Sequence, residues 1–149
     1  MYKLFSFSFF IFLSNIAFSQ VEKKAEIKNI IEINPEFPGG QNELFRFIGK
    51  NLRYPANSRE KGNMGTIYVQ YIIDSTGRVI KPVIKAQKLY KLKRKNIFSK
   101  IQTLQVDNDI DLAEECLRIV KLMPEWKPGT QDGKPVQVTY TLPIKFKIE

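Results

Sequence analysis

Residues 136–148 read VQVTYTLPIKFKI, and this stretch decides the fold. Apolar side chains stand at every second position, and the positions between them hold polar residues and Pro143. A strand directs alternate side chains to the same face, whereas a helix would scatter this set around its axis. The pattern predicts one long strand with one buried face and one face turned to solvent.

A second alternating pattern lies at residues 65–74, GTIYVQYIID, and it predicts another strand. The tetrapeptide Asp74–Gly77 is typical of a tight hairpin turn, so residues 78–86 are expected to return as an antiparallel strand. Pro82 inside the returning strand predicts a sheet edge or a bulge, because proline has no N–H for the ladder. The face of the first strand expected to be buried is formed by Ile67, Val69, Tyr71 and Ile73.

Helices are expected before the hairpin and before the last strand. Pro38-Gly39-Gly40 predicts a helix start, and that helix should end before Tyr54-Pro55, since a residue preceding proline avoids the helical region. A short helix at 55–61 capped by Gly62 follows. The clearest helix is expected from an N-cap at Asp111, with Glu114 completing a capping box, to Met123. The stripe of this helix that should be buried consists of Leu112, Cys116, Ile119, Val120 and Met123.

This order of elements predicts an α+β fold, with two helices packed on one face of a small three-stranded antiparallel sheet. Trp126 follows the main helix and is expected to plug the space between the helix end and the sheet. The chain has 149 residues, which suits a single domain.

Composition excludes several classes of enzyme. The chain has no histidine and a single cysteine, so it cannot form a Ser-His or Cys-His catalytic pair, an intrachain disulfide or a CxxC motif. Asp107, Asp109 and Asp111 resemble the start of a calcium loop, but the glycine and glutamate such a loop needs are missing. We therefore expect no enzyme, no metal site and no cofactor.

Residues 1–19 have the pattern of a secretory signal, with Lys3 before an apolar run and small residues near its end. Cleavage is expected between Ser19 and Gln20, which would leave a short leader at 20–36 and a domain at 37–149. An uncleaved anchor is the alternative, although the apolar run is shorter than a typical membrane span.

The net charge is +9, and for an exported protein this favours lipid headgroups, cell-wall polymers or acidic proteins over nucleic acid as partners.

Residues 87–106 are the least readable part of the chain. They carry six basic residues and no acid, and Ile97, Ile101 and Leu104 suggest a short helix. A solvated basic insertion and an anion-docking patch are both compatible with this composition.

The last strand is about twice the usual length, so part of its backbone is expected to lack a partner if the strand lies at an edge. An edge strand can capture an extended peptide by strand addition. Alternatively, the excess length pairs with residues 27–33 of the leader or with a second copy of the chain.

Several of these motifs together resemble one family. Pro35–Gly40, Tyr54-Pro55, the strand at Gly65 with its hairpin, Met123–Gly129, Gly133–Val136 and Tyr140–Phe146 are similar, in order and spacing, to the C-terminal domain of TonB, in the style of Bacteroidetes energy transducers. The resemblance runs from about Pro35 to Glu149.

The resemblance implies a periplasmic domain with two helices on a three-stranded sheet. It further implies that the last strand binds the TonB-box peptide of outer-membrane transporters, and that the segment around Tyr-Pro also meets the transporter. The residues that match these sites are Val138, Thr139, Tyr140, Thr141, Leu142, Ile144 and Phe146 in the strand, and Asn51, Arg53, Tyr54 and Pro55 in the segment.

The expected function is therefore that of a periplasmic TonB-like protein in energy-transducing transport across the outer membrane. If the signal remained as an anchor, inner-membrane motor proteins would be further partners. The alternative function is a non-energised periplasmic adaptor, or a strand-swapped homodimer that docks on the cell envelope.

Overall fold

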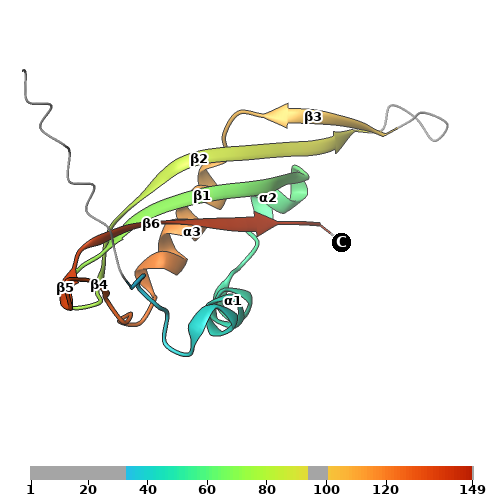
Figure 1. Cartoon of the computed structure of the whole chain (residues 1–149). Coiled ribbons are helices and arrows are strands. Elements are labelled where there is room, and N and C mark those ends of the chain that lie inside the picture. Colours follow the sequence, from blue (N-terminus) through green and yellow to red (C-terminus); the bar gives the residue numbers. More distant parts are fainter. Residues whose placement is uncertain (1–32, 94–100, 149) are drawn as a thin grey trace, which may run out of the picture.

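The computed structural model describes residues 33–93 and 101–148, and its main feature is a four-stranded antiparallel sheet (Figure 1). The strand order is β3-β2-β1-β6. The sheet consists of β1 (Asn63–Ile73), β2 (Val79–Lys93), β3 (Gln102–Val106) and β6 (Val138–Phe146). A separate two-stranded sheet joins β4 (Gly129–Gln131) to β5 (Lys134–Val136).

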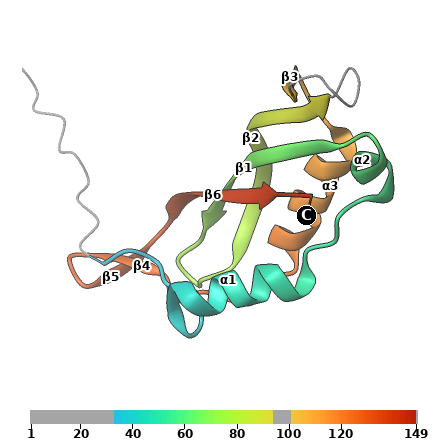
Figure 2. The same cartoon turned by 90° about the vertical axis from the view of Figure 1, so that its right-hand side faces the viewer.

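The helices are α1 (Gly40–Asn51), α2 (Ala56–Glu60) and α3 (Ile110–Lys121). α3 packs against β1 and β2, and α1 adds Leu44 to the same core (Figure 2). The predicted buried face of β1 is confirmed, because all four of its side chains are fully buried. Most of the predicted stripe of α3 is buried too, and only Met123 is half-exposed. The α+β fold class predicted from the sequence is what the structure shows.

Trp126 closes one end of this core, as its position in the sequence predicts. Its ring is buried and stands perpendicular to Phe37, with the ring centroids 5.5 Å apart. The backbone N–H of Trp126 donates to the carbonyl oxygen of Gly77 at 2.8 Å, which joins the hairpin turn to the segment after α3. Gly77 has φ of +90°, and a Cβ at this position would lie 1.9 Å from the Trp126 carbonyl oxygen. The turn therefore requires glycine both for its conformation and for this close approach.

The region around residues 87–106 differs from the prediction. β2 continues to Lys93 and pairs with β3, so the sheet has a fourth strand in place of the short helix expected near Ile101 and Leu104. Leu104 lies in β3 opposite Lys91. The edge of β2 supplies backbone partners to this segment, and such pairing outweighs a weak helical spacing.

The N-terminus of α3 also differs. Asp109, and not Asp111, is the N-cap: its backbone is extended, and its side chain accepts a hydrogen bond from the N–H of Leu112 at 3.0 Å. The helix ends at Lys121, two residues before Met123. α1 ends at Asn51 and Pro55 is the N-cap of α2, close to the predicted boundaries.

The single strand predicted for residues 136–148 is divided in two at Gln137. β5 ends at Val136 and pairs with β4, whereas β6 begins at Val138 and pairs with β1. The division arises because the turn at Asp132-Gly133 folds β5 back onto β4. The pattern of alternation continues through the break although the strand does not.

Two smaller expectations are resolved by the register. Pro82 lies where β2 is irregular opposite Gln70–Ile72, beside Lys81 with φ of +52°, so the predicted bulge is confirmed. The described end of the leader does not pair with β6. Instead, Ile33 bridges Thr130 and Glu36 bridges Lys127. Residues 1–32, including the expected cleavage site at Ser19 and Gln20, lie outside the described residues, as does Ile97.

Candidate functional site

β6 lies at one edge of the four-stranded sheet. On one side it pairs with β1 in an unbroken register from Gly65 opposite Phe146 to Ile73 opposite Val138. On its other side, no strand of residues 33–93 or 101–148 is paired with it (Figure 1). Alternate residues of this nine-residue strand direct their backbone N–H and C=O groups outward, and these groups are without a strand partner in the described part of the chain.

The side chains of β6 alternate strictly. Val138, Leu142, Ile144 and Phe146 are buried against the core, and Tyr140 between them is half-buried. Thr139, Thr141, Pro143 and Lys145 are exposed on the opposite face. The core side chains hold the strand in place, so the position of its outer edge is fixed.

Pro143 indicates which backbone groups point outward. Within sheets, proline is tolerated where its missing N–H would face a free edge. Residues of the same parity share the direction of their N–H groups, so Thr139, Thr141 and Lys145 direct theirs away from β1. The outer edge then offers three donors, interrupted at Pro143.

The Tyr-Pro segment meets the end of this strand. The Tyr54 ring packs edge-on against Phe146 with centroids 5.3 Å apart, and its hydroxyl donates to the Asn63 carbonyl oxygen at 2.5 Å. Burial raises the pKa of Tyr54, so the hydroxyl stays a donor at neutral pH. The structure thus brings together two of the residues that the sequence assigned to the partner site from distant positions.

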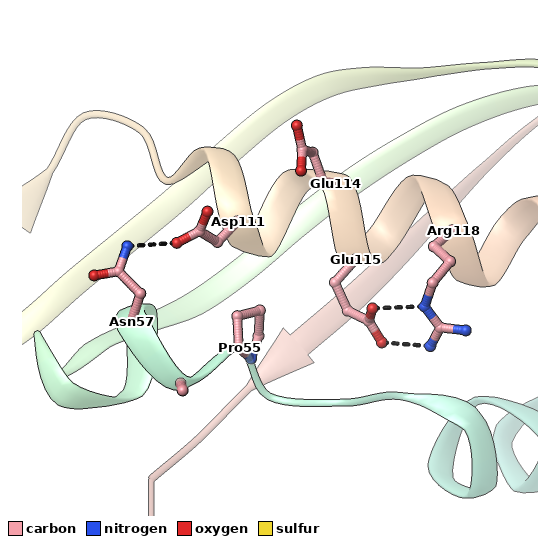
Figure 3. A pocket seen from close by; sticks show the side chains of 7 residues that line it. Pro55, Asn57, Asp111, Glu114, Glu115 and Arg118 are labelled. Carbon is pink, nitrogen blue, oxygen red and sulfur yellow. Dashed lines mark hydrogen bonds and ion pairs between the residues drawn. The ribbon is translucent and has the colours of Figure 1, made fainter.

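Asn51 and Arg53, in contrast, are bound to α3. The Arg53 N–H donates to Glu115 at 2.7 Å, and the Arg118 guanidinium donates to the Asn51 carbonyl oxygen at 2.7 Å. Arg118 and Glu115 form an ion pair at 2.6 Å (Figure 3). Burial opposes ionisation of Glu115, but the hydrogen bonds from Arg118 and Arg53 hold its pKa below the ordinary value. This clamp fixes the connection between α1 and α2, and hence the position of Tyr54.

A hollow lies at each end of β6. At the C-terminal end, a pocket of about 230 Å³ is lined by Tyr54, Arg59, Lys147 and Ile148. At the N-terminal end, a pocket of about 390 Å³ lies between Phe37, Leu44, Trp126 and Tyr140, among other residues. Sequence reasoning did not assign Phe37 or Trp126 to the site, because their aromatic character indicates only burial.

A larger hollow, of about 590 Å³, lies between α2 and α3 (Figure 3). Asp111, Glu114 and Glu115 line it, and Asn57 donates to Asp111 at 2.5 Å. Among the described residues, no cluster of three metal-ligating side chains is present. Within the same ranges, no helix has the length and apolar character needed to cross a membrane.

A comparison with family models agrees with the resemblance seen in the sequence. Residues 91–148 match the family model described as Gram-negative bacterial TonB protein C-terminal. No curated protein was found to match the chain. A solved structure, the NMR solution structure of the TonB C-terminal domain of Helicobacter pylori (residues 179–285), is 19% identical; the alignment covers 75% of this chain and 89% of that one, with a TM-score of 0.38.

The family match covers β3, α3 and all of β4 to β6, so it includes the edge strand described above. Residues 91–148 of this chain are thus similar to the C-terminal part of Gram-negative bacterial TonB proteins.

Proposed function

We propose that this chain is a periplasmic TonB-like protein that binds a TonB-box peptide of an outer-membrane transporter as an added strand on β6. The bound peptide would continue the sheet beyond β6, antiparallel or parallel to it. In this role the protein takes part in energy-transducing transport across the outer membrane.

The observation that carries the proposal is the position of β6 at the sheet edge. Had β6 been paired on both sides by other parts of the described chain, no backbone groups would remain for a guest strand. Instead its outer side has no strand partner among residues 33–93 and 101–148, while its core side chains anchor it firmly. Backbone hydrogen bonds of strand addition provide affinity that depends little on sequence.

Selectivity would come from the surroundings of the edge. Lys145 and Lys147 are exposed beside the C-terminal half of the strand, so they favour a guest with an acidic residue there. The pocket beside Tyr54 and the apolar pocket beside Tyr140 lie at opposite ends of β6 and can each receive a guest side chain.

The direct test is a titration of the ¹⁵N-labelled exported protein with a TonB-box peptide, followed by amide NMR. The largest shifts are expected at residues 138–146, with smaller ones at Tyr54. Absence of shifts at millimolar peptide would refute strand addition.

A pair of variants at one position separates backbone pairing from side-chain contact. Thr141→Pro removes an outward N–H from the middle of the edge, whereas Thr141→Val keeps the N–H and the branched shape. We expect the proline variant to lose at least tenfold in affinity, since about two outer hydrogen bonds to the guest are lost or weakened at roughly 1 kcal/mol each. The valine variant should bind like wild type, and equal affinity of both variants would contradict the proposal. Thermal unfolding confirms that both are folded.

The adaptor alternative uses the same edge differently. If β6 pairs with β6 of a second copy, sedimentation will show a stable dimer that the peptide does not dissociate. A monomer, or a dimer that peptide converts to monomer, supports the transporter role.

The intact mass of the exported protein decides whether it begins at Gln20, as a released periplasmic module would, or at Met1, as an anchored and motor-coupled form would.

A further inference from the structure

The positive charge of this protein is concentrated in one part of the chain. Residues 75–106 contain nine lysines and arginines and no acidic residue, which equals the entire net charge of +9. The rest of the sequence is balanced between acids and bases. Charge placed this unevenly creates a local field that attracts anions.

The described part of this region forms a two-stranded projection, which we name the basic arm: residues 88–93 of β2 and residues 101–106 (Figure 1). β1 begins at Asn63 opposite Lys91, so Leu92 and Lys93 pair only with β3. The arm thus extends beyond the sheet at the edge opposite to β6.

One face of the arm combines aliphatic and basic side chains. Leu92 stands opposite Thr103, and Ile101 continues the same face two residues away, so the two aliphatic side chains are diagonal neighbours. Leu92 is 52% and Ile101 47% exposed. Tyr90 and Lys88 share this face, and the Lys88 Nζ lies 5.3 Å from the centre of the Tyr68 ring.

The lysines of the arm are not neutralised by the described residues. Lys88 and Lys93 are exposed and Lys91 is half-exposed. The ion pairs formed within residues 33–93 and 101–148 lie elsewhere, at Arg46, Arg78 and Arg118. The arm is therefore able to bind external anions without first breaking an ion pair in this part of the molecule.

From these features we propose that the basic arm docks on the surface of an anionic phospholipid bilayer. The lysines contact headgroup phosphates, Leu92 and Ile101 enter the boundary of the acyl chains, and Tyr90 lies at the level of the headgroups. Lys91 and Lys93 point to the other face, but the arm is only two strands wide here, and their long side chains can reach the headgroups around its sides.

The aliphatic pair distinguishes a bilayer from a soluble polyanion. A polyanion would bind the lysines and leave Leu92 and Ile101 in water. A bilayer satisfies both kinds of side chain in one contact, which is the combination found in interfacial membrane anchors. This inference goes beyond the proposed function, because it concerns the opposite edge of the sheet and does not depend on peptide binding.

The test is flotation of the full exported protein with vesicles made of equal parts phosphatidylcholine and phosphatidylglycerol, compared with vesicles of pure phosphatidylcholine. All variants must share one N-terminus by intact mass, so that residues 1–32 contribute equally. The charge variant is Lys88→Gln/Lys91→Gln/Lys93→Gln. Its matched control removes the same charge from exposed lysines elsewhere: Lys121→Gln/Lys127→Gln/Lys134→Gln.

A second pair of variants tests the aliphatic contact. Leu92→Ser/Ile101→Ser removes the apolar side chains of the arm, and Ile110→Ser/Leu122→Ser removes two exposed apolar side chains at the ends of α3 as the control. Circular dichroism and thermal unfolding confirm that every variant is folded.

Wild-type protein is expected to float with the mixed vesicles and not with pure phosphatidylcholine. A lysine at an anionic surface contributes about a fivefold gain in affinity, so the arm charge variant should bind on the order of 100-fold more weakly. The arm serine variant should lose about tenfold, and both controls should stay within about threefold of wild type.

Absence of wild-type binding to mixed vesicles overturns the proposal. Equal losses in the arm and control charge variants overturn it too, because net charge alone would then explain binding. If the arm serine variant binds as well as wild type, the arm recognises charge only, and a soluble anionic polymer replaces the bilayer as its partner.

Discussion

Asp109 joins three elements of the fold, and replacing it by alanine should be among the most damaging single changes. Its buried carboxylate accepts hydrogen bonds from the Ser58 hydroxyl at 2.8 Å, the Asn63 amide at 2.8 Å and the Leu112 N–H at 3.0 Å. These donors belong to α2, β1 and α3, respectively. One side chain thus holds the start of α3 against the sheet and the short helix.

The size of the effect follows from these contacts. Loss of an N-cap costs about 1 kcal/mol. Ser58 and Asn63 are themselves buried, and each donor left without a partner costs a further 1–3 kcal/mol or so. Asp109→Ala should therefore lower the free energy of unfolding by about 4 kcal/mol, out of the roughly 5–15 kcal/mol that is usual for a domain.

Urea unfolding of the protein measures this loss directly, with the fluorescence of the buried Trp126 as the probe. Asp107→Ala is the matched control, because Asp107 is exposed two residues away and should change stability by less than about 0.5 kcal/mol. In the Asp109→Ala background, Ser58→Ala should cost less than it does in wild type, since the unpaired hydroxyl is then removed. A loss below about 1.5 kcal/mol, or no coupling between the two positions, would refute the assigned role.

Three further outcomes are expected. Glu115 has a pKa below its ordinary value of 4.5, so its stabilising effect is complete above that pH and is lost as the pH falls; urea unfolding should show the stability difference between wild type and Glu115→Gln shrinking on acidification, and a constant difference would contradict this. Gly77→Ala should lower the thermal midpoint far more than Gly133→Ala, because only the new methyl group at Gly77 meets the Trp126 carbonyl oxygen, whereas Gly133 has open space around it. Burial raises the pKa of Cys116 to about 12, so its reaction with iodoacetamide at neutral pH should be slow in native protein and fast in urea; rapid native labelling would mean that the core is more open than described.

The sequence predicts the core of this fold well, because the spacing of apolar and polar residues indicates which side chains are buried. The alternation at Ile67–Ile73 predicts a strand, and the glycine at position 77 predicts a tight turn. The structure has both. β3 could not be predicted in the same way, since the polar sequence of Gln102–Val106 becomes a strand only through the exposed edge of β2 beside it. The cap of α3 was predicted at Asp111, which is wrong: aspartates occur at three alternate positions, and it is Asp109 that accepts hydrogen bonds from the buried Ser58 and Asn63 side chains.

The candidate site was predictable only in part, for a related reason. Alternation at Val138–Phe146 states that one face is buried, but it contains no information about which strand lies beside it. Strand order is set by how the whole chain packs, so the edge position of β6 emerges only in three dimensions. The meeting of Tyr54 with Phe146 is equally non-local, and the sequence suggested it only through the family resemblance.

The two proposed contacts use the two opposite edges of one sheet. The order β3-β2-β1-β6 separates the basic arm from the peptide-binding edge by three strand spacings, or about 14 Å. Docking the arm on a bilayer therefore does not cover β6, and a guest strand on β6 does not cover the arm. If both contacts form, the bilayer holds the free edge close to its surface, where a peptide emerging from a transporter is at high effective concentration. The net positive charge is confined to residues 75–106, while acids and bases balance in the rest of the chain, and such an arrangement requires this separation.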